Sequence, residues 1–251
     1  VWILLALAVA LVALVIFLRT EAVRKDALLD LSLFKNPLFS ISILCGFLVF
    51  TANFCFNIIA PFYAQNMLNL SPFAAGFLLM LFPICMVIVA PVSGALSDKI
   101  GSELLTFAGL VVMVIAQFGL AWLHEGSSLV LVGLWIAMLG IGSGLFQSPN
   151  NSLVMSQVPR TQLGSAGSVN SLVRNVGMVV GITVATTILF HVMSLRAGRR
   201  VTGLVPGHPD IFLSGMHAVF STSACICLVA AALTGWRMYR AKAGKRREVK
   251  A

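Results

Sequence analysis

Long apolar stretches separated by short polar connections dominate the residue pattern of this chain. Seven stretches are predicted to be membrane-spanning helices, at about 1–18, 38–63, 73–96, 104–123, 129–149, 172–192 and 212–236. Most are close to the roughly 20 residues that a helix needs to cross about 30 Å of hydrocarbon. Short connections such as Ser71-Pro72 and Gly126-Ser127 carry turn and capping residues. The pattern therefore predicts an all-α polytopic membrane protein.

Composition supports this class and excludes several others. Hydrophobic residues make up 59% of the 251 residues and charged residues 10%, whereas soluble domains carry about 25% charged residues. Seven of the 17 basic residues follow Trp236, which indicates a membrane-flanking tail rather than a nucleic-acid site. The five cysteines lie in apolar stretches without C-x-x-C spacing, so we expect neither a metal nor a cofactor. The chain starts at Val1 within an apolar stretch, which suggests a fragment that continues upstream.

The distribution of basic residues predicts the orientation of the spans. The connections at 19–37, 97–103 and 150–171 and the tail alternate along the chain and hold thirteen Lys and Arg residues outside the spans. The intervening connections hold three, which are Arg196, Arg199 and Arg200. Because cytoplasmic loops are enriched in basic residues, the C-terminus is expected in the cytoplasm.

Acidic residues are missing from the middle of every predicted span. Proton-driven carriers usually move protons through carboxylates or histidines inside the membrane. Any proton relay is therefore expected outside this segment, or at His191 or His217 near the outer ends of two spans.

Small and polar residues follow one face of the span at 172–192 and of the segment leading into it. Gly167, Asn170, Arg174, Gly177 and Gly181 are spaced by three or four residues, which places them on one side of a helix. Arg174 either reaches the headgroups or lines a cavity and bridges helices, because a charge is expensive in hydrocarbon. The two later glycines favour close helix packing.

Two further spans carry polar side chains. Asn53 and Asn57 lie one turn apart at 38–63, where two amides serve either as interhelical hydrogen bonds or as a substrate-facing patch. The span at 129–149 carries a face of small and polar residues, and Pro149 is expected to break that helix. The spans at 104–123 and 212–236 are apolar on nearly all faces and are predicted to be peripheral.

The connection at 94–104 has a pattern that resembles the signature loop of the major facilitator superfamily. Its matching positions are Gly94, Leu96, Asp98, Lys99 and Gly101. Segments 30–37, 140–151 and 158–181 also resemble parts of the second half of that family's fourteen-span drug:proton antiporter branch. In this chain, Ser102-Glu103 replaces the basic pair that usually follows the signature glycine.

The resemblance implies a domain plan. Residues 38–236 correspond to the six-helix C-terminal bundle, residues 1–37 to an extra linker transmembrane helix with its cytoplasmic connection, and residues 237–251 to a basic cytoplasmic tail. The family lines its central cavity with the first, second, fourth and fifth helices of each half. Its antiporter glycine motif and proton-carrying carboxylates belong to the N-terminal half, and its branch is common in bacterial inner membranes.

The resulting hypothesis is a secondary active exporter that alternates access to a midplane cavity. Its expected partners are an amphipathic small molecule, protons, the lipid bilayer and an N-terminal half of the same polypeptide, without nucleic acid. The predicted cavity wall consists of Asn53, Phe54, Asn57, Gln147, Asn150, Asn170 and Arg174, and the predicted conformational loop of Gly94, Asp98, Lys99 and Gly101. The predicted helix-packing positions are Gly140, Gly144, Gly177 and Gly181.

Two roles within this hypothesis are more specific. Asp98 is expected to stabilise one conformer at the hinge by capping a helix N-terminus, and Arg174 to gate the path or bridge helices. The alternatives are an exporter of a metabolite such as a siderophore, peptide or amino acid, and a seven-span receptor. A membrane enzyme is disfavoured because no depth gathers the required His, Asp, Glu or Cys residues.

Overall fold

Six long helices form the part of the chain that the computed structural model describes, which comprises residues 31–203 and 207–248 with isolated positions before residue 21. The elements are η1 (Leu31–Lys35), α2 (Pro37–Asn66), α3 (Pro72–Leu79), α4 (Leu81–Ile100), α5 (Ser102–Ala121), α6 (Leu129–Ser156), η2 (Arg160–Gln162), α7 (Leu163–Ala197) and α8 (Pro209–Glu248). The span expected at 1–18 lies outside the described residues. The described residues hold six helical segments long and apolar enough to cross a membrane, with α3 and α4 together forming one of them. The predicted all-α bundle is thereby confirmed.

Capping residues explain where three of the spans begin. Asn36, Ser71 and Ser128 each accept a hydrogen bond from a backbone N–H in the first helical turn. A proline follows Asn36 and Ser71 directly, and proline is favoured at the first helical position because no intrahelical N–H is needed there. These local signals fix the starts of α2, α3 and α6.

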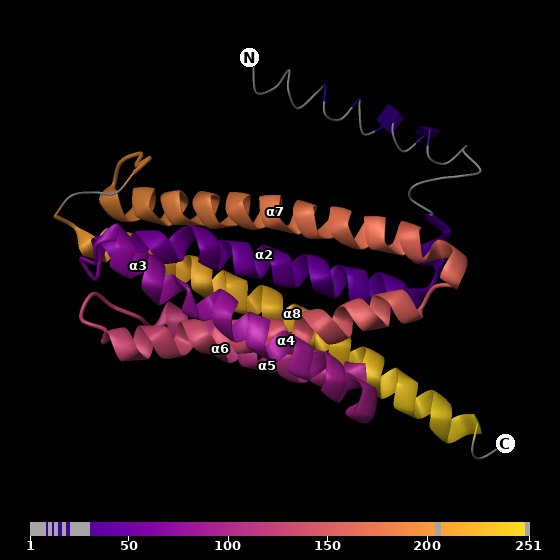
Figure 1. The fold of residues 1–251 in the computed structure, drawn as a ribbon. Helices are drawn as coiled ribbons and strands as arrows, with labels where there is room; N and C mark the ends of the chain where they lie inside the picture. Colours follow the sequence, from indigo (N-terminus) through magenta and orange to yellow (C-terminus); the bar gives the residue numbers. More distant parts are fainter. Residues whose placement is uncertain are drawn as a thin grey trace.

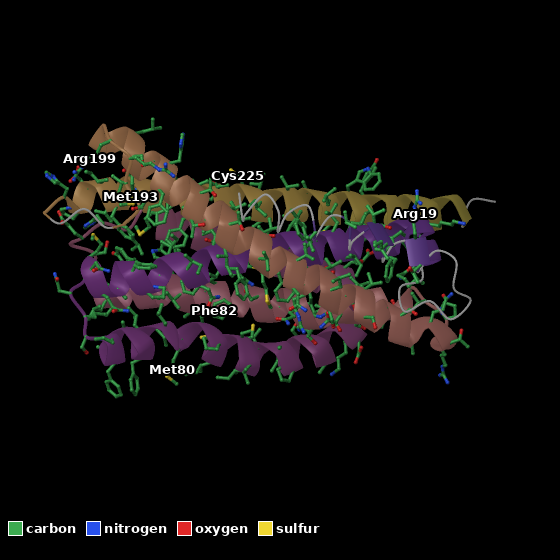
Figure 2. The ribbon with its side chains drawn as sticks, turned by 90° about the horizontal axis from the view of Figure 1, so that it is seen from above. Arg19, Met80, Phe82, Met193, Arg199 and Cys225 are labelled. Atoms are coloured by element: carbon green, nitrogen blue, oxygen red, sulfur yellow. The ribbon has the colours of Figure 1, made fainter. Side chains whose placement is uncertain are left out.

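The helices lie side by side, and their connections alternate between the two ends of the bundle (Figure 1). The start of α2, the α4–α5 turn, the α6–α7 connection and the C-terminal end of α8 lie at one end. Arg19 and Arg199 mark opposite ends of the molecule (Figure 2). We call the end that holds the α4–α5 turn the turn end.

Helix α2 occupies the centre of the arrangement and contacts α6, α7 and α8, while α5 lies against α6 and α8. The span formed by α3 and α4 packs mainly against α6, and only 6% of the residues in an apolar 18-residue stretch of this span are buried. Helix α5, which the sequence predicts to be peripheral, is 56% buried in the same measure, and α8 is 44% buried. An apolar surface on all sides suits a helix core as well as lipid, so polarity did not separate the two environments.

Pro149 does not end its helix, contrary to the expectation from the sequence. Helix α6 continues to Ser156. A proline at position 149 removes the N–H that would bond to the carbonyl of residue 145. The hydroxyl of Ser93 on α4 donates to that carbonyl, Leu145 O, at 3.1 Å. A side chain from a neighbouring helix thus supplies the missing donor, as is common in transmembrane helices.

Candidate functional site

The segment that resembles the signature loop is almost entirely helical. Helix α4 runs to Ile100, α5 starts at Ser102, and Gly101 alone joins them. Gly101 has φ of +96° and ψ of 136°, and its N–H donates to Ser97 O at 2.9 Å. Asp98 and Lys99 are exposed on the last turn of α4. No side chain caps the N-terminus of α5 among the described residues, and the capping role expected of Asp98 stays a prediction.

Replacement of Gly101 by alanine tests this sharp turn. The positive φ places Gly101 in a region that side-chain-bearing residues occupy at a penalty of about 1–3 kcal/mol. We expect Gly101→Ala to destabilise the purified protein by about 2 kcal/mol, measured as a lowered midpoint of thermal unfolding. Gly126→Ala on the α5–α6 connection is the control, because its φ is not positive. Equal midpoints for the two variants would contradict the prediction.

A buried arginine lies next to this turn, although the sequence assigns it to the solvated tail. Arg237 belongs to α8 and is 3% exposed. Its Nε lies 3.5 Å from Oε1 of Glu103 on α5, and its Nη1 donates to Oγ of Ser42 on α2 at 2.7 Å. We call Ser42, Glu103 and Arg237 the charge clamp. The tail expected to begin at residue 237 is therefore helical and packed at its start.

Two of the predicted cavity amides instead join helices within the bundle. Asn53 is buried and exchanges hydrogen bonds with Ser143 Oγ on α6 at 3.2 and 3.3 Å. Asn150 is 3% exposed and donates from Nδ2 to Ser42 O at 3.2 Å. Of the two readings that the sequence leaves open for Asn53, the geometry favours the interhelical hydrogen bond.

Asn57 has a different environment from Asn53, one turn away. Its side chain is exposed, and its Nδ2 donates to Asn53 O at 3.1 Å. It borders a groove of about 370 Å³ between α2 and the α3–α4 span. The groove is lined mainly by apolar residues, among them Phe56, Ala60, Pro61, Met80, Phe82 and Pro83. Phe82 lies on the side of α4 toward the bundle and Met80 on the outer side (Figure 2), and the ring centroids of Phe56 and Phe82 are 5.5 Å apart.

Polar residues of α7 contact α2 and α6 near the turn end. The Arg174 guanidinium lies over the Phe50 ring, 5.8 Å from its centroid, while the side chain stays exposed. Asn170 Nδ2 donates to Asn151 Oδ1 at 3.0 Å. Gln147 is half-buried on α6. The contact with Phe50 connects Arg174 of α7 to α2, while the rest of the Arg174 side chain is exposed.

The predicted packing glycines face backbone atoms of neighbouring helices. A Cβ on Gly177 would lie 2.9 Å from Phe47 O, and one on Gly181 would meet Thr51 O and lie 2.9 Å from Phe54 Cβ. On α6, a Cβ on Gly140 would meet Phe82 O, and one on Gly144 would lie 3.0 Å from Met86 O. A Cβ on Gly94 of α4 would in turn lie 2.9 Å from Ser148 Oγ. The α2–α7 and α4–α6 pairs therefore approach as closely as glycine allows.

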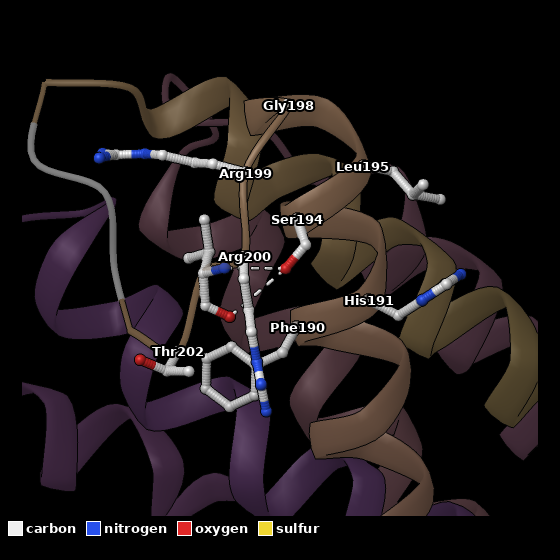
Figure 3. Close-up of a pocket in the computed structure, with 9 residues that line it drawn as sticks. Phe190, His191, Ser194, Leu195, Gly198, Arg199, Arg200 and Thr202 are labelled. Carbon is white, nitrogen blue, oxygen red and sulfur yellow. Dashed lines mark hydrogen bonds between the residues drawn. The ribbon is translucent and has the colours of Figure 1, made fainter.

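A basic recess of about 880 Å³ lies at the opposite end of the bundle, beneath the start of the α7–α8 connection (Figure 3). Gly198 has φ of +64° and reverses the chain. The Ser194 hydroxyl accepts a hydrogen bond from Val201 N at 2.9 Å and donates one to Val201 O at 3.4 Å. Arg199 and Arg200 border the recess, and neither has an acidic partner among the described residues.

Six apolar spans, short connections and buried interhelical polar contacts define a polytopic α-helical membrane protein. The family model described as Major Facilitator Superfamily matches residues 1–182. The chain belongs to this superfamily, and its fold is that of a six-helix half of such a transporter.

Curated relatives include transporters with different substrates. The chain is 30% identical over 225 residues to the riboflavin transporter RibZ of Clostridioides difficile, a match that covers 88% of this chain and 48% of RibZ. It is 28% identical to the lincomycin resistance protein LmrB of Listeria innocua, covering 74% of this chain and 40% of LmrB. The multidrug resistance protein Stp of Mycobacterium tuberculosis is 28% identical, with 78% and 36% covered. The chain thus spans about half or less of the length of these relatives.

Proposed function

We propose that this chain forms one half of a secondary active transporter that exports small amphipathic organic molecules by alternating access. The observation that carries the proposal is membership of the superfamily combined with the exposed groove beside Asn57. A second six-helix bundle of the same polypeptide would cover the exposed faces of α4 and α7 and enclose a path between the halves. The proposed location is a bacterial inner membrane with the turn end in the cytoplasm.

The groove chemistry supports an amphipathic substrate. Aromatic and aliphatic side chains provide most of its lining, and Asn57 provides an amide whose Oδ1 has no bond among the described residues. Such a wall suits a flat, mostly apolar compound that offers a hydrogen-bond donor. Arg174 would line the cytoplasmic part of the path and disfavour cations close to it.

Two substrate classes fit this proposal. Drug compounds are favoured by the similarity to LmrB and Stp, and a vitamin-like metabolite such as riboflavin by the similarity to RibZ. We propose drug export as the first candidate and metabolite export as the second. Competition between riboflavin and a cationic dye for transport separates the two candidates.

Transport in everted membrane vesicles that carry the intact polypeptide tests the proposal. We expect a transported dye or riboflavin to accumulate when a pH gradient is imposed, and to leave when the gradient is collapsed. Protons would enter through carboxylates of the other bundle, because the described spans hold none at mid-depth. Accumulation that ignores the pH gradient contradicts proton antiport, and absence of gradient-driven uptake of every compound contradicts export.

Asn57 is expected to contribute to substrate affinity. Replacement by alanine removes the amide that faces the groove, and loss of one hydrogen bond of about 1 kcal/mol should raise the apparent KM for transport about fivefold. Asn66→Ala is a matched control, since Asn66 is also an exposed α2 asparagine that donates to the carbonyl four residues earlier. Equal KM values for the two variants would remove Asn57 from the proposed wall.

A further inference from the structure

The acidic residue that departs from the family pattern has a partner in this structure. Glu103 occupies a position where the signature loop usually has a basic residue. Its carboxylate is 32% exposed and lies 3.5 Å from Nε of Arg237, whose side chain is 2% exposed. The charge at this position is therefore reversed relative to the usual pattern, and the arginine of α8 supplies the opposite charge.

The charge clamp joins three helices beside the one-residue turn, and Asn150 links it to a fourth. Glu103 is the second residue of α5, directly after Gly101 and Ser102. Arg237 connects Glu103 to Ser42 on α2, and the carbonyl of Ser42 accepts from Asn150 on α6. Movement of the turn away from α8 would strand the buried guanidinium, which is strongly unfavourable. The clamp thus restrains the α4–α5 turn relative to α2 and α8.

We propose that Glu103 and Arg237 are positioning residues of the transport cycle, which hold the signature turn fixed to α2 and α8 through a charge pair of reversed order. The pair does not contact substrate; it makes the turn end of this bundle move as one body. The kinetic part of this inference rests on the proposed transport function. The structural part is measurable without transport.

Cys45 provides a reporter of the seam between α2 and α8. It lies one helical turn after Ser42 and is 1% exposed. Its Sγ is 3.6 Å from Ala230 O and 3.5 Å from Thr234 Oγ1, one turn before Arg237. A maleimide reaches this thiol only when α8 separates from α2 at the level of the clamp.

The experiment measures the maleimide labelling rate of Cys45 in the intact polypeptide, in a background where the other cysteines are alanine. We expect Glu103→Gln to raise the rate at least tenfold, because the amide removes the charge that holds Arg237 in place. Glu125→Gln makes the same chemical change on the exposed α5–α6 connection and should leave the rate unchanged. The reversed pair E103R/R237E is expected to restore protection of Cys45. Should the reversed pair not fold, Arg237→Lys should label more slowly than Arg237→Gln, because lysine keeps the charge.

Three outcomes would overturn the proposal. The first is an unchanged labelling rate of Cys45 in Glu103→Gln. The second is an equal increase at Cys227, which is fully buried elsewhere on α8 and reports general loosening when it is the sole cysteine. The third is equally fast labelling in Arg237→Lys and Arg237→Gln, which would show that charge is irrelevant.

Transport kinetics then connect the clamp to the cycle. We expect Glu103→Gln to lower the maximal transport rate at least fivefold with little change in apparent KM, since neither residue of the pair faces the groove. A lowered rate with a proportionally changed KM would overturn the positioning role. If the parent protein transports nothing while Cys45 behaves as expected, the proposed function fails and the clamp stands.

Discussion

Replacement of Gly181 by valine is expected to destabilise the bundle by about 3 kcal/mol or more. A Cβ at this position meets the backbone carbonyl of Thr51 and lies 2.9 Å from Cβ of Phe54. Backbone atoms of a membrane-spanning helix cannot rotate away, so α7 would have to move off α2 along its length. Overpacking of a tight interface usually costs about 1–3 kcal/mol, and the carbonyl contact places this variant at or above that upper limit.

Gly164→Val on the same helix is the matched control, because nothing lies within 4 Å of a Cβ there. Valine is a better helix former than glycine, so the exchange by itself favours the helix in both variants. The difference between the two variants therefore reports mainly packing. The measurement is the thermal unfolding midpoint in detergent, together with the yield of monodisperse protein. A Gly181→Val protein as stable as Gly164→Val would contradict the close approach of α7 to the backbone of α2 at Thr51.

Removal of Glu103 alone is expected to have the second largest effect on stability. Glu103→Leu leaves the Arg237 guanidinium buried without its acidic neighbour. Breaking a buried ion pair from one side typically costs about 3–5 kcal/mol. We expect about 3 kcal/mol, at the low end, because the 32% exposure of Glu103 lets water reach the pair.

The double variant E103L/R237L should recover most of this loss. Replacing both members of a buried pair with apolar side chains is often neutral, so we expect it to lie within about 1 kcal/mol of the parent. Steric trapping or thermal unfolding measures the stability of the parent, of Glu103→Leu and of the double variant. A double variant less stable than Glu103→Leu would show that Arg237 contributes through Ser42 rather than through the charge of Glu103.

The positions of the spans were predictable because hydrophobic length is a local property of the sequence. The expected span at 38–63 is α2 at Pro37–Asn66, and the expected span at 104–123 is α5 at Ser102–Ala121. The ends of α6 and α7 were predicted too short by several residues. Both helices continue into polar segments, where no apolar run marks them and the backbone hydrogen bonds persist.

The candidate site was predictable in residue type but less so in placement. One turn separates Asn53 from Asn57, yet Asn53 is buried against Ser143 while Asn57 borders the groove. The sequence assigns Arg237 to the tail because a count of charged residues does not indicate how deeply a side chain is buried. Its hydrogen-bond partner Ser42 lies 195 positions earlier in the chain, so only the packed structure reveals the clamp. The conflict between Glu103 and the family pattern was the one available signal.

The hydroxyl of Ser93 makes the shape of one helix depend on the seating of another. Leu145 O receives a hydrogen bond from Ser93 on α4, whereas Pro149 of α6 has no N–H to offer it. The local hydrogen bonding of α6 near Pro149 therefore depends on the position of α4. A displacement of α4 away from α6 that breaks this hydrogen bond would leave Leu145 O without the donor that Ser93 supplies. The straightness of α6 at Pro149 is therefore expected to depend on how closely the exposed α4 packs against it.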